Sequence, residues 1–108
     1  MIIRTEVQSS QTVVSLVGRF DAHETEGFRR TVTPLLSAES AVLRVDLSQV
    51  AFVDSTALAE LVRLQKAAKA LGGEIILAQL SDPVRVILEI TDIAGLFTIE
   101  GPPAEVTG

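Results

Sequence analysis

A long amphipathic segment between two strongly apolar ones constrains the fold of this chain more than any other feature. The apolar segments, Val42–Leu47 and Glu74–Leu80, are rich in Val, Ile and Leu, which is typical of buried strands. The segment between them begins after Asp54, has apolar residues near a 3.6-residue period, and ends at Gly72-Gly73, a glycine stop signal for a helix. A strand, a helix and a second strand in this order imply parallel strands joined by a right-handed crossover.

The segments before this unit continue the alternation. Ile2–Gln8 and Thr12–Val17 predict a hairpin across Ser9-Ser10-Gln11, and the second strand is apolar enough to lie inside the sheet. Gly18 breaks the strand pattern. A helix is then predicted from His23 to about Ser37, with Pro34 interrupting it.

The segments after the unit complete a single domain. Ser81-Asp82-Pro83 predicts a helix start, a short turn follows through Ile93–Leu96, and Phe97–Glu100 predicts a last strand. We expect one domain over residues 1–100 and a flexible C-terminal tail over residues 101–108. The predicted fold class is α/β, a mixed and mainly parallel sheet with the order β-β-α-β-α-β-α-α-β.

Composition excludes several classes of function. A net charge of −5 disfavours non-specific binding to nucleic acid or to anionic lipid, and four Phe with no Trp or Tyr disfavour a base-stacking surface. The chain has no Cys, so it offers no disulfide and no thiolate ligand. No apolar run approaches the length needed to span a bilayer, and we expect a cytoplasmic protein without direct membrane contact.

The predicted sheet brings polar segments to one edge. The carboxyl ends of parallel strands meet at the same edge, which is where such folds place their sites. The strands predicted to end at Val17, Leu47 and Leu80 would gather Arg19 and Asp21, Ser48 through Thr56, and Ser81 with Asp82.

The residues at this edge do not predict an enzyme. The only His is His23, in a polar helix start, and Ser55 lacks the flanking glycines of a nucleophile elbow. No glycine-rich phosphate loop is present. The carboxylates of Asp21, Asp46, Asp54 and Asp82 could hold a metal, but Asp at strand and helix ends is more often a cap or a turn former. We therefore expect no catalysis, no cofactor and no metal.

Asp54-Ser55-Thr56 at the start of the long helix is open to two interpretations. Side-chain oxygens of these residue types satisfy the unpaired N–H groups at a helix start, so the triplet is first of all a cap. The same place, at the positive end of a helix dipole, suits a phosphate. The residue pattern alone favours the cap.

Four segments in order resemble the STAS domain of bacterial anti-anti-sigma factors: Leu16 to Asp21, Leu43 to Ser48, Val50 to Leu61, and Leu71 to Glu74. The segment Asp54-Ser55-Thr56-Ala57-Leu58 is similar to the family signature Asp-Ser-[Ser/Thr]-Gly-Leu, with Ala57 in place of Gly. The resemblance runs to Phe97 and implies a sheet with its helices on one face.

The resemblance also implies a phosphoswitch. Ser55 would be the phosphoacceptor, with Thr56 as the alternative, and the partners would be an anti-sigma factor with serine kinase activity and a serine phosphatase. Unphosphorylated protein would bind the anti-sigma factor and so release the sigma factor. The expected partner-binding residues are Arg19, Asp21, Asp54, Thr56, Ala57, Leu58, Glu60 and Leu61.

Two other functions remain open at this point. A STAS domain docked permanently on a lipid-transport or anion-transport complex would use Ser55 only as a cap, and the methyl group of Ala57 beside the phosphoacceptor leaves room for it. A small nucleotide-binding protein would use the helix start for a phosphate. For the oligomeric state we expect a monomer or a weak dimer.

Overall fold

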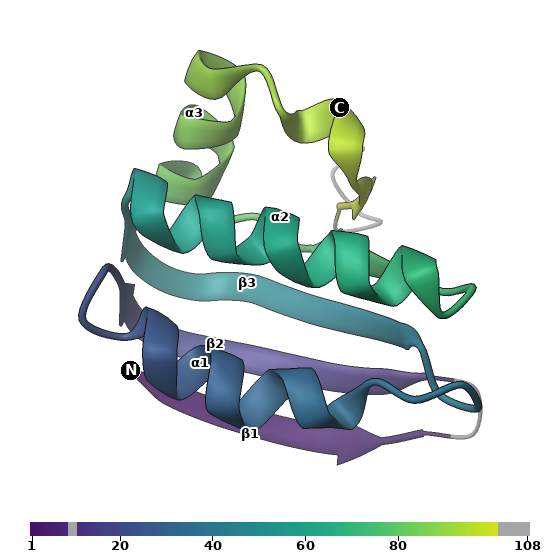
Figure 1. Cartoon of the computed structure of the whole chain (residues 1–108). Coiled ribbons are helices and arrows are strands. Elements are labelled where there is room, and N and C mark those ends of the chain that lie inside the picture. The colour runs from purple at the N-terminus through teal and green to yellow at the C-terminus, as the bar shows by residue number, and fades with distance from the viewer. Residues whose placement is uncertain (9–10, 102–108) are drawn as a thin grey trace.

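Five strands form one sheet in the order β1-β2-β3-β4-β5 in a computed structural model that describes residues 1–8 and 11–101 (Figure 1). The strands are β1 (Ile2–Val7), β2 (Thr12–Phe20), β3 (Val42–Val53), β4 (Glu74–Ala78) and β5 (Thr98–Glu100). The helices are α1 (Thr25–Val32), α2 (Ser55–Ala70) and α3 (Asp82–Thr91), with 3₁₀ turns η1 (Thr33–Leu35) and η2 (Ala94–Leu96).

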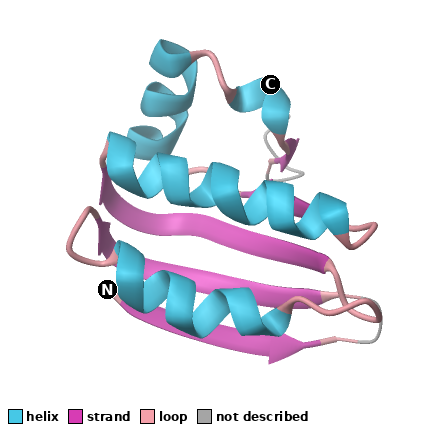
Figure 2. Ribbon diagram, viewed as in Figure 1, coloured by secondary structure: helices cyan, strands magenta, loops and turns pink. Residues whose placement is uncertain are grey.

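The connections between strands place the helices on one face. β1 pairs antiparallel with β2, and every other neighbouring pair is parallel. Each crossover steps to the next strand in the same direction, and right-handed crossovers in one direction put their helices on one side of the sheet. Figure 2 shows α1 and α2 side by side in front of the sheet. The predicted fold class is confirmed.

The core lies between this face of the sheet and the helices. Every second side chain is buried from Thr12 to Leu16 on β2 and from Leu43 to Leu47 on β3, among them Val14 and Val45. The rings of Phe20 on β2 and Phe28 on α1 pack with their centroids 4.8 Å apart and are fully buried. Apolar area removed from water is the main stabilising term in such a layer, so these positions fix which face each strand presents.

Two strands are longer than the sequence predicted. β2 continues past Gly18 to Phe20, and β3 continues past Leu47 to Val53, where a loop had been expected. Gly18 has φ of 109° and the register between β2 and β3 shifts beside it, which marks a bulge that a residue with a Cβ would accommodate only with strain. The bulge keeps β2 and β3 paired through the polar residues Ser48 and Gln49, so Asp54 directly follows the end of β3.

The remaining elements differ from the predictions only in their ends. α1 begins at Thr25, and Pro34 lies in η1 directly after it, so the expected interruption is present. α2 ends at Ala70, where Gly72, with φ of 85°, donates its N–H to the Lys69 carbonyl at 3.0 Å. The expected turn at Ser9-Ser10 and the expected tail after Gly101 lie outside the described residues. Within the described ranges, no helix is long and apolar enough to cross a membrane.

Candidate functional site

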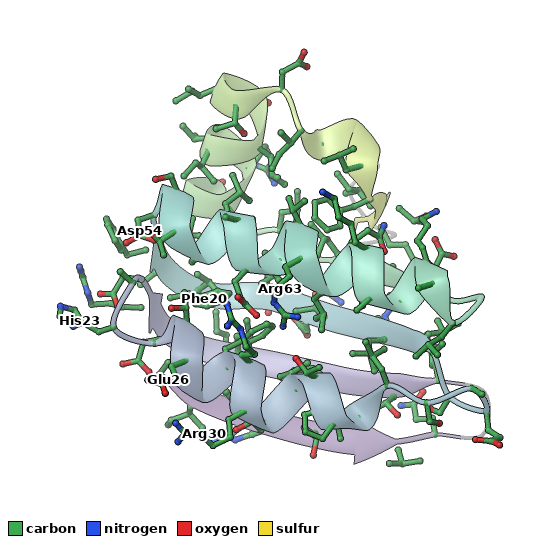
Figure 3. The ribbon with its side chains drawn as sticks, viewed as in Figure 1. Phe20, His23, Glu26, Arg30, Asp54 and Arg63 are labelled. Carbon is green, nitrogen blue, oxygen red and sulfur yellow. The ribbon has the colours of Figure 1, made fainter. Side chains whose placement is uncertain are left out.

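Asp54 joins two segments that are far apart in the sequence. It is the residue before α2, and its Oδ1 accepts a hydrogen bond from the N–H of Ala57 at 2.9 Å, which caps the helix. Its Oδ2 accepts a second bond from the N–H of Ala22 at 3.0 Å, in the loop between β2 and α1. One carboxylate therefore holds the start of α2 against this loop, and Figure 3 shows it at that end of the helix.

Ser55 and Thr56 are the first two residues of α2, and both are exposed. The N–H groups at the start of a helix have no partner within it, and here Asp54 takes up only that of Ala57. The Ser55 side chain thus lies at the positive end of a sixteen-residue helix, open to an approaching protein. Asp54 performs the capping that the sequence left open among three residues.

Arg19 and Phe52 add a cationic and an apolar group at the same end of the sheet. They are register partners on β2 and β3, and the Arg19 guanidinium lies 4.2 Å from the centroid of the Phe52 ring. Arg19 Nε also lies 3.6 Å from Asp21 Oδ2, while Asp21 Oδ1 accepts a hydrogen bond from the N–H of His23 at 3.0 Å. Phe52 was not predicted as a site residue. No local pattern marks it, because burial along β3 no longer alternates after Leu47: the two residues between Val50 and Val53 are both exposed.

We call the surface formed by Arg19, Asp21, Phe52, Asp54, Ser55 and Thr56 the Ser55 surface. Asp54 and Asp21 each hold part of the β2–α1 loop through the bonds given above, and the Asp54 N–H lies 3.4 Å from the Phe20 carbonyl. The surface therefore combines two fixed carboxylates, one stacked guanidinium, one half-exposed ring and two free hydroxyl groups. This arrangement can recognise a partner, and it can change when a phosphate is added.

Four of the residues expected to bind the partner are buried and do not form part of this surface. Ala57, Leu58, Glu60 and Leu61 are each at most 3% exposed. They fall on the side of α2 that packs against the sheet and α1, because the 3.6-residue period turns these positions inward. The Ala57 methyl group is fully buried as well, so it is not in the way of an approaching backbone.

Glu60 is a buried charge between α1 and α2. Its carboxylate accepts hydrogen bonds from Arg29 on α1 at 2.8 Å and from Arg63 on α2 at 2.6 Å, and Arg63 also donates to Thr33 Oγ1 at 2.9 Å. Burial alone would raise the pKa of the Glu60 carboxyl, but the hydrogen bonds from the two guanidinium groups outweigh it and hold that pKa below its usual value. Figure 3 shows Arg63 between the two helices.

A family model described as the STAS domain matches residues 3–105 of this chain. This is nearly the whole sequence. The chain belongs to the STAS domain family.

Several proteins similar to this STAS domain are named as anti-sigma factor antagonists. The chain is 28% identical over 95 residues to an anti-sigma-B factor antagonist of Listeria monocytogenes, which covers 88% of this chain and 83% of the relative. It is similar to the structure of an anti-sigma-factor antagonist (STAS) domain protein from Planctomyces limnophilus, with a TM-score of 0.82, 25% identity, and coverage of 95% and 92%. The fold is also shared with the Bacillus cell fate determinant SpoIIAA in its phosphorylated form, with a TM-score of 0.72, 19% identity, and coverage of 96% and 95%.

The structure brings together only part of the edge that the sequence predicted for this STAS domain. Ser81 lies beside Leu47, whose carbonyl accepts its N–H at 3.3 Å, and Leu47 stands six residues before the end of β3. Among the residues that the structure describes, no hydrogen bond or ion pair joins Ser81 or Asp82 to the Ser55 surface. Among residues 1–8 and 11–101, no group of three or more His, Cys, Asp or Glu side chains is arranged to hold a metal ion.

Proposed function

We propose that this STAS domain is an anti-sigma factor antagonist that binds an anti-sigma factor with serine kinase activity through the Ser55 surface. Phosphorylation of Ser55 by that partner ends the complex, and a serine phosphatase restores it, all within the cytoplasm. The observation that carries the proposal is the position of Ser55, which is exposed at the first turn of α2 while the neighbouring Asp54 does the capping. The names of the relatives support the choice of partner class.

The domain itself tolerates the phosphate. A phosphoserine brings about −1.5 to −2 charges at neutral pH, and the dipole at a helix start favours negative charge. The free N–H groups of the first turn can donate to phosphate oxygens. Asp54 already occupies the Ala57 N–H, so the cap does not depend on Ser55 remaining unmodified. The phosphorylated domain should therefore keep its fold.

The partner is where the phosphate acts. The Ser55 surface already holds two carboxylates, Asp21 and Asp54, and Arg19 is held beside Asp21 and over Phe52. A partner packed against Ser55 would enclose a dianion next to these groups. A buried charge without a counterion costs several kcal/mol, which corresponds to a loss of affinity by orders of magnitude.

We expect the base for the transfer to come from the partner. Asp54, next to Ser55 in the chain, has both carboxylate oxygens engaged by backbone N–H groups, and among the described residues Ser55 makes no side-chain hydrogen bond to a carboxylate or to the His23 ring. The domain is thus proposed as substrate and ligand of the kinase, acting by binding and not by catalysis.

Phosphoryl transfer is tested with the kinase-type anti-sigma factor of the same organism, Mg²⁺-ATP and intact mass measurement. We expect a gain of about 80 Da, one phosphoryl group, in the wild-type chain. Ser55→Ala should abolish the gain, and Thr56→Ala is the matched control because it removes the neighbouring exposed hydroxyl. A gain that persists in Ser55→Ala and disappears in Thr56→Ala would transfer the role to Thr56.

The switch is tested by calorimetric titration of the same anti-sigma factor. Wild type and Ser55→Ala should bind with similar affinity, and the phosphorylated protein about a hundredfold more weakly or worse. Equal affinity of the phosphorylated and unphosphorylated forms would leave a docking domain without a switch, as in a permanent subunit of a larger complex, and would refute the proposal.

A further inference from the structure

The outer edge of β1 offers a row of backbone groups to another strand. Within residues 1–8 and 11–101, β1 pairs with β2 alone, and the Gln8 N–H donates to the Gln11 carbonyl at 2.8 Å where the hairpin closes. In an antiparallel pair, residues alternate between facing their partner and facing away. Gln8, Glu6, Arg4 and Ile2 therefore turn their backbone groups toward β2. Those of Ile3, Thr5 and Val7 face outward.

The other edge of the sheet is a poor template by comparison. β5 has only three residues, Thr98–Glu100, whereas β1 has six. Five of the six residues of β1 are exposed, including the large apolar side chain of Val7 at 79%. A long edge strand that is not covered is a site for pairing with a further strand.

The residues of β1 are complementary to a second copy of β1 in one antiparallel register. A two-fold axis through Thr5 places Thr5 opposite Thr5, Ile3 opposite Val7, and Arg4 opposite Glu6 of the other copy. Ile3, Thr5 and Val7 are the residues with outward backbone groups, so this register forms a continuous ladder. It also pairs two arginines with two glutamates on one face and two apolar pairs on the other.

The charges of β1 have no partner of their own. Arg4 and Glu6 are exposed, and within the described ranges neither takes part in an ion pair. Their neighbours across β2 are Ser15 and Val13, which carry no charge. A second copy would supply an ion pair to each at once.

We propose that two copies of this chain pair through β1 about a two-fold axis at Thr5, which joins the two five-stranded sheets into one continuous sheet. The occupant is a second copy because the register is complementary to itself in charge, in apolar contacts and in backbone groups. The side of α1 toward this edge carries the exposed pair Glu26 and Arg30, 3.2 Å apart, so the helices above the axis present both charges to each other (Figure 3). Ser55 follows β3, two strands away, and is not used.

Charge exchange tests the register. By sedimentation velocity over a micromolar to millimolar series, Arg4→Glu alone and Glu6→Arg alone should each weaken dimerisation about tenfold, because like charges replace both pairs. The double variant Arg4→Glu/Glu6→Arg should dimerise like wild type, and an equimolar mixture of the two single variants should form a heterodimer. These residues are exposed, so circular dichroism should confirm that every variant is folded.

An intermolecular contact tests the pairing directly. Ile3 and Val7 of one copy are about 13 Å apart along the strand, too far for a nuclear Overhauser effect, whereas the proposed axis sets them opposite each other. In a sample mixed from labelled and unlabelled protein, an isotope-filtered spectrum should show a cross-peak between their methyl groups. A wild-type chain that remains monomeric throughout the series, or a dimer without this cross-peak and indifferent to charge exchange, would overturn the proposal. Either result leaves the role of Ser55 unaffected.

Discussion

Ser55 and Glu60 lie on the same helix, five residues apart, in opposite surroundings. Ser55 is exposed and neutral at the first turn, while Glu60 is 3% exposed, charged, and held by two arginines from α1 and α2. A charge added at Ser55 is solvated by water and stabilised by the helix dipole, and a partner that buries it has to supply a counterion. The charge at Glu60 is already paired with arginines inside the domain. The comparison indicates that α2 carries a permanent, stabilising charge on its buried side and, at its first turn, an exposed position where a charge can be added and removed.

We expect the largest effect on stability when the charge of Glu60 is removed. Glu60→Gln keeps the shape but loses charge-assisted hydrogen bonds to Arg29 and Arg63, and we expect the free energy of unfolding to fall by about 2 kcal/mol. The two guanidinium groups can still reach water, which limits the loss. Urea unfolding measures it. Glu26→Gln, in the exposed pair with Arg30, is the control and should change stability by less than about 0.5 kcal/mol.

Asp54 is less exposed than Ser55 and less buried than Glu60, and the contributions of its two carboxylate oxygens can be measured separately. Asp54→Ala removes the cap and the bond to the Ala22 N–H, so we expect a loss of about 1 to 2 kcal/mol. Asp54→Asn keeps an acceptor for the Ala57 N–H but places an amide donor opposite Ala22. It should therefore lose only part of this stability, with the added hydrogen exchange confined to the β2–α1 loop. No loss in Asp54→Asn would show that the loop contact contributes nothing, and equal losses in both variants would show that the cap contributes nothing.

Lowering the pH should reduce the free energy of unfolding through Glu60, by a smaller amount than the substitutions above. Since the folded pKa of Glu60 lies below its usual value of 4.5, the ionised carboxylate contributes stability that is complete above that pH. This contribution is lost as the pH falls through the lower, folded pKa. The unfolding free energy of wild type should decline more steeply than that of Glu60→Gln over this acidic range. Parallel curves would show that Glu60 is not linked to folding.

The smallest effect is expected at Ser55. Ser55→Asp places a carboxylate at an exposed position in the first turn of α2, where the dipole favours it, so stability should stay within about 0.5 kcal/mol of wild type. Thermal unfolding by calorimetry measures it. A large destabilisation would mean that charge at this position is not tolerated by the domain, and the contrast with Glu60 would disappear.

The sequence predicted the elements of this fold well and their ends less well. The period of the apolar residues and the glycines after α2 located the helices and strands, because burial of one face leaves a direct record in the spacing. The extension of β3 to Val53 was missed because Ser48 and Gln49 read as a loop. Their pairing depends on the bulge in β2, a relation between strands that no local pattern contains.

For the site, the sequence identified the place and not the direction of each side chain. Asp54, Ser55 and Thr56 were singled out from the helix start, and Arg19 and Asp21 from the sheet edge where parallel strands end and from the family resemblance. Glu60 was expected among the partner-binding residues, and the structure instead buries it with its charge paired to Arg29 from α1 and to Arg63. Contacts between elements distant in the sequence decide such cases.

The bulge at Gly18 determines the orientation of the Arg19 guanidinium that follows it. Any side chain at this position would press the backbone out of its left-handed angle, and relief would come by shifting the last residues of β2 along their neighbour. Arg19 would then leave the ring of Phe52, and Asp21 would lose its cation. A single backbone torsion at a glycine thus orients the guanidinium group of the Ser55 surface.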